Sequence, residues 1–422
     1  MRSTTRVQLS FMMFLEFFIW GGWFVTLGTF LTNNLQASGG EAASVFSTQS
    51  WGAIIAPFII GLIADKYINA EKILGALHIA GAVLMYQMYQ SEAINEFYPY
   101  VLIYMILYMP TLALVNSVSF NQMKNPEKEF SGIRVCGTIG WILAGLLISF
   151  MFHWDSAENT REGLLRNTFL MSGIASLVLG LFSFTLPKTP PKGKGEKVDI
   201  KQIIGLDALK LLKDKNFAVF FIASILICIP LAFYYQNAHP FLSNIGLENP
   251  TGKMTIGQIS EVLFLLLLPV FFTRFGFKNT ILVGMLAWAV RYVLFAFGDA
   301  GDLSFMLILG IALHGICYDF FFVSGQIYTN ARAGEKYKSS AQGLITLATY
   351  GIGMLIGFAI AGKITDAYKL SDTDFDYKMI WLIPAGIAFA VLCIFALFFR
   401  NDTKKQVTEG EAEIGLSASP IT

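Results

Sequence analysis

Apolar stretches of about 20 residues, long enough to cross a bilayer as a helix, recur along the whole chain between short polar segments. Inside a bilayer a helix satisfies its own backbone hydrogen bonds. The pattern therefore predicts about twelve membrane-spanning helices. Their expected limits are residues 9–32, 42–64, 72–91, 98–121, 131–153, 166–186, 217–239, 255–273, 279–297, 303–330, 339–365 and 378–400.

The composition agrees with this pattern, since 55% of the 422 residues are hydrophobic and 14% are charged. A soluble domain carries about 25% charged residues, so these values indicate an all-α polytopic membrane protein. The four cysteines lie inside apolar stretches without C-x-x-C spacing, and we expect packing roles, with no disulfide and no metal site. The first apolar run is too long for a cleaved signal peptide and is expected to remain as a helix.

Basic residues are distributed unevenly between the two sets of loops. The N-terminus, the loops after even-numbered spans and the C-terminus hold most of the 30 lysines and arginines. Because loops rich in lysine and arginine stay on the cytoplasmic side, both termini are expected in the cytoplasm.

The longest internal connection, residues 187–216, divides the chain into two halves. It begins with a basic, proline-rich and glycine-rich run, typical of a flexible linker. Residues 199–213 are amphipathic and predict an interfacial helix on the cytoplasmic leaflet, with a calmodulin-like partner site as the alternative. The expected domains are two pseudo-symmetric six-helix bundles, 1–186 and 217–400, with this cytoplasmic linker between them and a disordered cytoplasmic tail, 401–422. Six spans on either side of a central loop are typical of transporters whose halves rock about a site at the midplane.

A carboxylate, Glu261, lies inside the apolar stretch 256–269, and Gln258 shares its helical face. A carboxylate at the centre of a membrane helix costs about 2.5–3.5 kcal/mol and usually faces a polar cavity or a partner. We therefore expect these two residues to contact a substrate or an ion. The alternative is a structural hydrogen bond between helices.

Two other spans carry polar and aromatic stripes with helical i, i+4, i+7 spacing. One stripe is Glu16, Trp20 and Trp23, where the tryptophans suit either a planar ligand or packing, and an interfacial position is the alternative for Glu16. The second is Arg134, Thr138 and Trp141, which offers a cation, a hydroxyl and an aromatic ring. Its alternative is an arginine that extends to the cytoplasmic interface.

Spans seven and ten are also unusually polar. Tyr235 and His239 are expected to line a cavity from span seven, and His314 and Tyr318 share a face of span ten. Asp319 is a second carboxylate within a span, and an apolar site disfavours its charged form, which suits a proton carrier. A structural role, as a helix cap or a partner of Arg134 or Arg291, is equally compatible with the pattern.

The loop that contains Gly61, Asp65 and Lys66 resembles the G-x-x-x-D-[RK] loop of the major facilitator superfamily, which acts in gating. The basic residues that usually follow are replaced here by Asn-Ala-Glu-Lys at 69–72. Walker, HExxH and nucleophile-elbow motifs are absent from the sequence. Transport by this chain would therefore be secondary and coupled to an ion.

Several short stretches together resemble the nucleoside:proton symporter family of the major facilitator superfamily, and they occur in the order of that family. They are W-G-G-W-F-V-T-L-G (20–28), Y-M-P-T-L (108–112), I-R-V-C-G-T-I-G (133–140), G-L-D-A (205–208), Q-I-S-E (258–261), F-G-F-K-N (275–279), D-F-F (319–321) and S-A-Q-G (340–343). The resemblance implies the major facilitator fold and proton-coupled import of nucleosides by alternating access.

The resemblance also implies roles for matching positions. Arg134, Thr138 and Trp141 would contact the nucleoside from the N-terminal half, and Gln258 and Glu261 from the C-terminal half, with Glu261 bonded to the ribose. The base would stack on rings from the set Trp20, Trp141, Tyr235 and Tyr318. His314 and Tyr318 occupy positions that carry aromatic residues in the family, and Glu261 or Asp319 would carry the proton. Tyr235 and His314 depart from the family pattern, which leaves purine and pyrimidine preference open.

The sequence therefore predicts a nucleoside:proton symporter of a bacterial inner membrane, driven by the proton gradient without a cofactor. A monomer that binds no nucleic acid is expected. A transporter of another polar solute, such as a sugar, or a drug exporter is the alternative within the same fold. An enzyme is not expected, because the four histidines are scattered over separate elements.

Overall fold

The computed structural model describes residues 2–59, 67–124, 126–191, 206–371 and 374–400, and its regular structure there is helical apart from one isolated bridge between Lys369 and Phe375. The chain forms two compact units. Unit 1 comprises residues 1–199 and 235–252, and unit 2 comprises residues 200–234 and 253–422. The second half of predicted span seven and the loop after it thus belong to unit 1.

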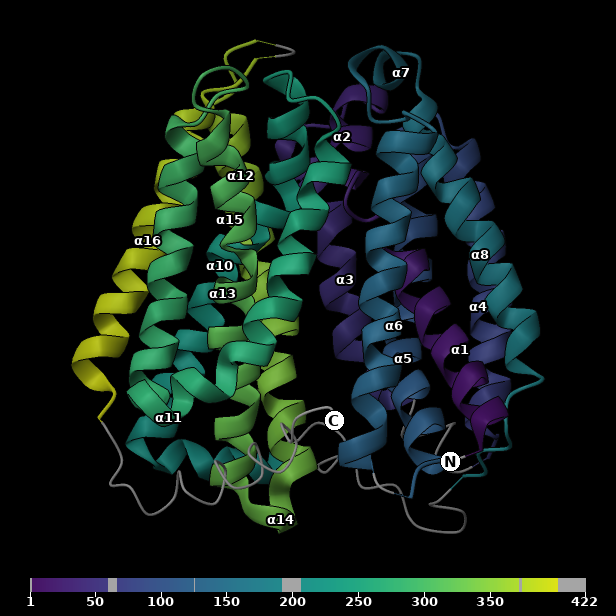
Figure 1. The fold of residues 1–422 in the computed structure, drawn as a ribbon. Coiled ribbons are helices and arrows are strands. Elements are labelled where there is room, and N and C mark those ends of the chain that lie inside the picture. The colour runs from purple at the N-terminus through teal and green to yellow at the C-terminus, as the bar shows by residue number, and fades with distance from the viewer. Residues whose placement is uncertain (1, 60–66, 125, 192–205, 372–373, 401–422) are drawn as a thin grey trace. The chain divides into compact units, whose positions relative to one another are not determined.

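Unit 1 contains the first six predicted spans. Its elements are α1 (Ser3–Gly21), α2 (Leu27–Thr29), η1 (Phe30–Asn34), α3 (Gly39–Ile59), α4 (Ala70–Gln90), α5 (Ile94–Asn121), α6 (Pro126–Leu146), η3 (Leu147–Met151), α7 (Ala157–Arg161), η4 (Leu164–Arg166) and α8 (Asn167–Ser183). Within the unit, α1 lies along α6, and α4 lies along α8 (Figure 1).

Glycines allow α1 and α6 to approach closely. A Cβ atom on Gly140 would lie 2.2 Å from the carbonyl oxygen of Phe14, and one on Gly137 would lie 2.7 Å from the ring of Phe17. A larger residue at either position would push the helices apart. This close approach brings the polar face of α6 against the aromatic face of α1.

Unit 2 contains the remaining elements. They are η5 (Leu206–Lys213), α10 (Lys215–Asn244), α11 (Pro250–Phe297), α12 (Ser304–Ala312), α13 (His314–Tyr318), η6 (Asp319–Val323), α14 (Ser324–Thr346), η7 (Leu347–Gly353), α15 (Met354–Ala367) and α16 (Tyr377–Phe398). The outer part of α10 and the first residues of α11 are the exceptions that belong to unit 1.

Two glycines divide long helices into separate spans. Gly276 interrupts α11 with φ 72°, and Gly334 interrupts α14 with φ 62°. Glycine adopts this backbone region without the steric cost that other residues incur. With these breaks, the helices accommodate the twelve predicted spans, and among the described residues eight helices are long and apolar enough to cross a membrane.

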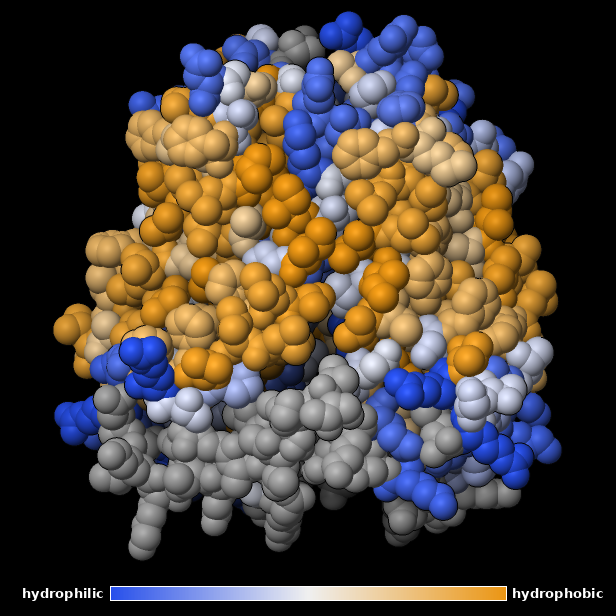
Figure 2. Space-filling view, in the orientation of Figure 1, coloured by the Kyte–Doolittle hydropathy of each residue, from blue (hydrophilic) through white to orange (hydrophobic). Residues whose placement is uncertain are grey.

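The outward-facing side chains of both units are largely apolar. A broad band of apolar residues crosses the helices on the face seen in Figure 2, whereas hydrophilic residues gather around α7. Leu181 of α8 is 58% exposed, and Leu266 of α11 and Leu397 of α16 are 73% and 78% exposed. Such a surface is stable in contact with lipid, and the chain is a multi-pass membrane protein.

The described part of the amphipathic segment is η5, a short 3-10 helix. Its Ala208 is buried together with Ala333, Ala341 and Leu344 of α14, and Leu211 packs against the same cluster. The apolar side of η5 thus contacts its own unit, and residues 192–205 lie outside the described part of the chain. The expected interfacial position stays a prediction.

The start of α11 is held within unit 1 by Asp155 and Ser149. The Asp155 carboxylate accepts a hydrogen bond from the backbone N–H of Thr251 (2.9 Å) and one from the Ser149 hydroxyl. Ser149 in turn accepts one from the backbone N–H of Gly252 (2.7 Å). These contacts satisfy backbone donors that a helix N-terminus leaves unpaired. Asp155 is 2% exposed, so water cannot replace it.

Replacement of Asp155 by alanine is expected to destabilise the protein by about 1–3 kcal/mol, because it leaves buried donors unpaired. The effect would be measured as a lower melting temperature in detergent. Asp302→Ala is the matched control, since Asp302 is exposed. Equal melting temperatures for the two variants would contradict a stabilising role for Asp155.

Candidate functional site

The predicted site residues of unit 1 are half-buried and share an aromatic neighbourhood. They are Trp20, Arg134, Thr138, Trp141 and Tyr235. The Trp20 ring centroid lies 5.7 Å from that of Trp141 and 5.9 Å from that of Phe24, which in turn lies 5.7 Å from Tyr235. The edge-to-face angles of these pairs are typical of favourable aromatic contacts. The structure thus brings α1, α6 and α10 residues of the prediction into one row.

Arg134 is held against α1 through an aromatic ring. Its guanidinium carbon lies 4.1 Å from the centroid of Phe17, a distance typical of a cation–π contact. In the described part of the chain, its buried Nη1 atom has no hydrogen-bond partner. Arg134 therefore keeps hydrogen-bond donors beside the row of rings, one turn of α6 before Thr138.

The stripe predicted for α1 is only partly correct. Trp20 belongs to the row, but Trp23 is fully buried in the core, 5.5 Å from Tyr104 and 5.9 Å from Phe169 between ring centroids. The reason is that α1 ends at Gly21, so that the helical spacing no longer applies. The alternative that Glu16 is interfacial is excluded, because its side chain is fully buried.

In unit 2, Glu261 and Asp319 lie close enough for the charge of Glu261 to act on Asp319. A Cβ atom on Gly315 would lie 2.6 Å from the Glu261 nitrogen, so α13 passes directly over α11 at this point. Asp319 is 1% exposed, and in the described residues neither of its carboxylate oxygens has a hydrogen-bond partner. Two carboxylates in one apolar site are not readily ionised together, which suits a pair that binds and releases a proton.

Asp319 also begins a stretch of π-helix, η6. Such π-helical turns are frequent at functional sites, because they change the register of the side chains that follow. Gln258 is half-buried on α11, about one turn before Glu261, and its expected contact with a substrate stays a prediction.

His314 lies in a stack of rings. Its centroid is 5.5 Å from that of Tyr234 and 5.9 Å from that of Tyr318. Its Nδ1 atom lies 3.0 Å from Nη1 of Arg291. Because a guanidinium only donates hydrogen bonds, Nδ1 accepts, and the ring proton of neutral His314 is on Nε2.

Pairing with Arg134 or Arg291 is the structural alternative for Asp319. The structure instead places the Arg291 guanidinium 3.6 Å from the centroid of Tyr234 and against His314. Arg291 is therefore not the partner of Asp319 within unit 2. The other alternative partner, Arg134, belongs to unit 1.

Tyr350 contacts the candidate residue Tyr318, and the sequence interpretation missed it. Its hydroxyl lies 2.8 Å from the Tyr318 hydroxyl. Tyr350 is also close enough to Glu261 for an electrostatic interaction between them. Tyr350 lies on η7, another π-helical stretch. A tyrosine in an apolar span carries no signal of its own, since most such tyrosines simply pack.

Other predicted residues lie elsewhere. His239 does not accompany Tyr235 as a cavity residue, since it is buried between the hydroxyls of Thr29 (2.6 Å) and Thr251 (2.7 Å). Gly61, Asp65 and Lys66, the expected gating residues, lie outside the described residues.

The two groups of residues offer complementary chemistry. Unit 1 presents aromatic rings with a cation and a hydroxyl, and unit 2 presents an amide, two carboxylates and phenol hydroxyls. Aromatic faces bind planar rings, and amide and carboxylate oxygens accept hydrogen bonds from sugar hydroxyls. Taken separately, the unit 1 residues suit a solute that contains a ring, and the unit 2 residues suit a hydroxylated solute and a proton.

Comparison with known proteins identifies relatives over nearly the whole chain. Residues 3–404 match the family model described as "Nucleoside H+ symporter". The chain is 42% identical to the Escherichia coli (strain K12) protein YegT, over 94% of each chain. It is 32% identical to the xanthosine permease of the same organism, over 94% of this chain and 97% of the permease.

The fold is that of a solved nucleoside transporter. The crystal structure of the nucleoside transporter NupG matches with a TM-score of 0.83 and 29% identity, over 94% of this chain and 100% of that one. The Escherichia coli (strain K12) nucleoside permease NupG is 31% identical to this chain, over 92% of this chain and 96% of the permease. The fold is therefore that of the major facilitator superfamily, as the sequence predicts.

Proposed function

Because the chain belongs to the nucleoside H+ symporter family, we propose that it imports nucleosides together with protons by alternating access. The observation that carries this proposal is the pair Glu261 and Asp319, two neighbouring carboxylates inside membrane-spanning helices. Membrane carboxylates of this kind are typical of proton relays in transporters. The proton gradient would supply the energy.

We assign the substrate contacts as follows. The base stacks on the aromatic row that contains Trp20, Trp141 and Tyr235, with Arg134 and Thr138 as hydrogen-bond donors. The ribose hydroxyls bond to Gln258 and Glu261, and His314 and Tyr318 contact the same ligand. The half-burial of most of these side chains supports the assignment, since a fully packed residue could not reach a solute.

The remaining features of the proposal rest on the distribution of charge between the loops and on the resemblance to the family. The protein resides in the inner membrane of a bacterium as a monomer, with both termini in the cytoplasm. The bundles 1–186 and 217–400 are joined by the linker 187–216 and move relative to each other during transport, and the tail 401–422 lies outside the described residues. The loop at Gly61, Asp65 and Lys66 acts in gating. The partners are the nucleoside and the lipid bilayer, and nucleic acid is not bound.

Uptake by proteoliposomes tests this function. With an acidic exterior, labelled uridine or adenosine is expected to accumulate inside, and a protonophore is expected to abolish the accumulation, because the energy comes from the proton gradient. Uptake that is indifferent to the protonophore would contradict proton coupling. Thermal stabilisation in detergent by sugars but not by nucleosides would instead favour a sugar transporter of the same fold.

A further inference from the structure

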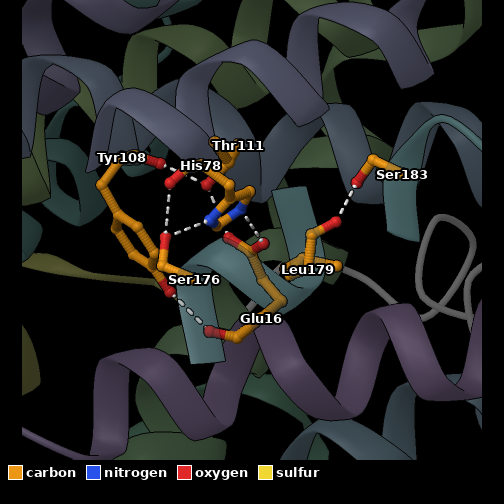
Figure 3. Close-up of polar contacts among 7 residues, drawn as sticks. All are labelled: Glu16, His78, Tyr108, Thr111, Ser176, Leu179 and Ser183. Atoms are coloured by element: carbon orange, nitrogen blue, oxygen red, sulfur yellow. Dashed lines mark hydrogen bonds and ion pairs between the residues drawn. The ribbon is translucent and has the colours of Figure 1, made fainter. Parts of the chain in front are cut away.

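Unit 1 contains a buried acid–base pair that the proposed substrate site does not use. The Glu16 carboxylate on α1 and the His78 imidazole on α4 are 0% and 1% exposed, and Oε2 of Glu16 lies 2.8 Å from Nε2 of His78. Figure 3 shows the imidazole between this carboxylate and the hydroxyl of Ser176 on α8. Every polar atom of the pair has a partner.

The hydrogen bonds allow two protonation states of the pair. The Ser176 hydroxyl oxygen lies 2.9 Å from the His78 carbonyl oxygen and 3.0 Å from Nδ1 of His78, and its one hydrogen can serve only one of them. One hydrogen lies between Nε2 and Glu16, because an unprotonated Nε2 and a carboxylate oxygen are both acceptors and would repel each other at 2.8 Å. When Ser176 donates to the carbonyl, Nδ1 carries a second hydrogen, and the pair holds one proton more than carboxylate plus neutral imidazole. When Ser176 donates to Nδ1, that extra proton is absent.

We propose that Glu16 and His78 form a proton-binding site in unit 1, separate from Glu261 and Asp319. With a hydrogen on Nδ1 the site is loaded and neutral overall. Loss of the proton leaves one negative charge on two fully buried side chains, which is costly in an apolar interior. It also requires the Ser176 hydroxyl to turn from the His78 carbonyl toward Nδ1. Proton release therefore accompanies a change in the hydrogen bonds between α4 and α8.

The surroundings allow such a rearrangement. From α5, the Thr111 hydroxyl lies 2.6 Å from both Glu16 Oε1 and the Tyr108 carbonyl oxygen. It has one hydrogen for these two acceptors, so it can switch between them when the charge of Glu16 changes. The other titratable or charged groups near Glu16 are the Tyr104 and Tyr108 phenols of α5 and, from α6, Arg134 over the adjacent Phe17 ring.

A short path leads from this pair to the aromatic row. The Tyr108 hydroxyl donates to the backbone carbonyl of Glu16 (2.7 Å), and the Tyr108 ring lies 5.8 Å from Trp20, one turn further along α1. A change in the proton occupancy of Glu16 therefore acts on the position of Trp20. This coupling to substrate rests on the proposed function, whereas proton binding itself does not.

Infrared difference spectroscopy of the purified full-length protein tests proton binding without any substrate. The difference between spectra in acidic and alkaline buffer is expected to contain a band from Glu16 in the wild type, either of a protonated carboxyl or of a carboxylate. Glu16→Gln is expected to lack this band. Ser176→Ala removes the hydrogen-bond partner of Nδ1. It is expected to shift the midpoint of the transition by about half to one pH unit, the equivalent of one hydrogen bond.

Ser183→Ala is the matched control, because Ser183 is a buried serine of the same helix that bonds only to the Leu179 carbonyl in the described residues (Figure 3). It is expected to leave the transition in place. Identical difference spectra for wild type and Glu16→Gln would overturn the proposal. So would equal transition midpoints for the two serine variants, which keeps the proposal testable if Glu16→Gln does not fold.

Transport assays then test the coupling. Gradient-driven accumulation by Glu16→Gln is expected to fall about tenfold, within the usual range of coupling energies, while nucleoside exchange without a gradient stays within about twofold. An equal loss of both activities would indicate a purely structural pair. If the wild type moves no nucleoside, the proposed function fails, and the infrared result still decides whether Glu16 and His78 bind a proton.

Discussion

Replacing Glu261 with glutamine is expected to weaken nucleoside binding by about 10- to 100-fold, because a hydrogen bond to a charged group contributes about 1.5–3 kcal/mol. Glutamine has the same size as glutamate and keeps one acceptor oxygen. A loss of affinity would therefore result from the missing charge and not from a change of shape. The dissociation constant would be measured by equilibrium binding in detergent, and the uptake KM in proteoliposomes.

The control for this substitution is Glu248→Gln, which makes the same chemical change at an exposed position. It is expected to bind nucleoside like the wild type. A dissociation constant for Glu261→Gln within about twofold of this control would remove Glu261 from the substrate site. Glu261 is half-buried, and its backbone packs tightly against Gly315. Its helix position is therefore fixed, while its side chain remains accessible to a solute.

Features that depend on local sequence were predictable. The spans follow from apolar runs, and the boundaries between merged helices fall at glycines that the hydropathy pattern also separates. Arg134, Thr138 and Trp141 share a face as predicted because α6 is regular between them. His314 and Tyr318 stack on each other for the same reason, since α13 is regular up to Asp319.

Features that depend on contacts between distant residues were not predictable. Glu16 is separated by 62 residues from His78 and by 95 from Thr111, and only the packing of α4 and α5 against α1 makes it a core residue. The carboxylate in an apolar span was visible in the sequence, but its partners were not. Tyr350 is a similar case, because its role depends on the approach of η7 to Tyr318.

The two predicted proton carriers differ in their surroundings in a way that the sequence could not reveal. Glu261 is half-buried, whereas Asp319 is buried without a hydrogen-bond partner among the described residues. A group that binds solute needs access, and a group that holds a proton in an apolar site needs only a path for that proton. This difference favours Glu261 for ribose recognition and Asp319 for proton transfer.

Replacement of Asp319 by asparagine is therefore expected to reduce gradient-driven accumulation at least about tenfold, within the usual range of coupling energies, while exchange without a gradient persists. Asparagine has nearly the same shape but cannot carry the proton. Because the Asp319 carboxylate has no hydrogen-bond partner in the described residues, the substitution should not lower the melting temperature. Asp302→Asn serves as the exposed control, and accumulation by Asp319→Asn equal to this control would exclude Asp319 as the carrier.

The neighbouring carboxylates also make a quantitative expectation possible. If the charge of Glu261 acts on Asp319, as their proximity indicates, the effects of Glu261→Gln and Asp319→Asn on binding should not add. Residues that interact directly show coupling energies of about 0.5–3 kcal/mol in double-mutant cycles. Nucleoside dissociation constants of the two single variants and the double variant would measure this term. Strictly additive effects on the binding free energy would mean that the two acids act independently. Proton transfer at Asp319 could then not be linked to ribose binding through Glu261.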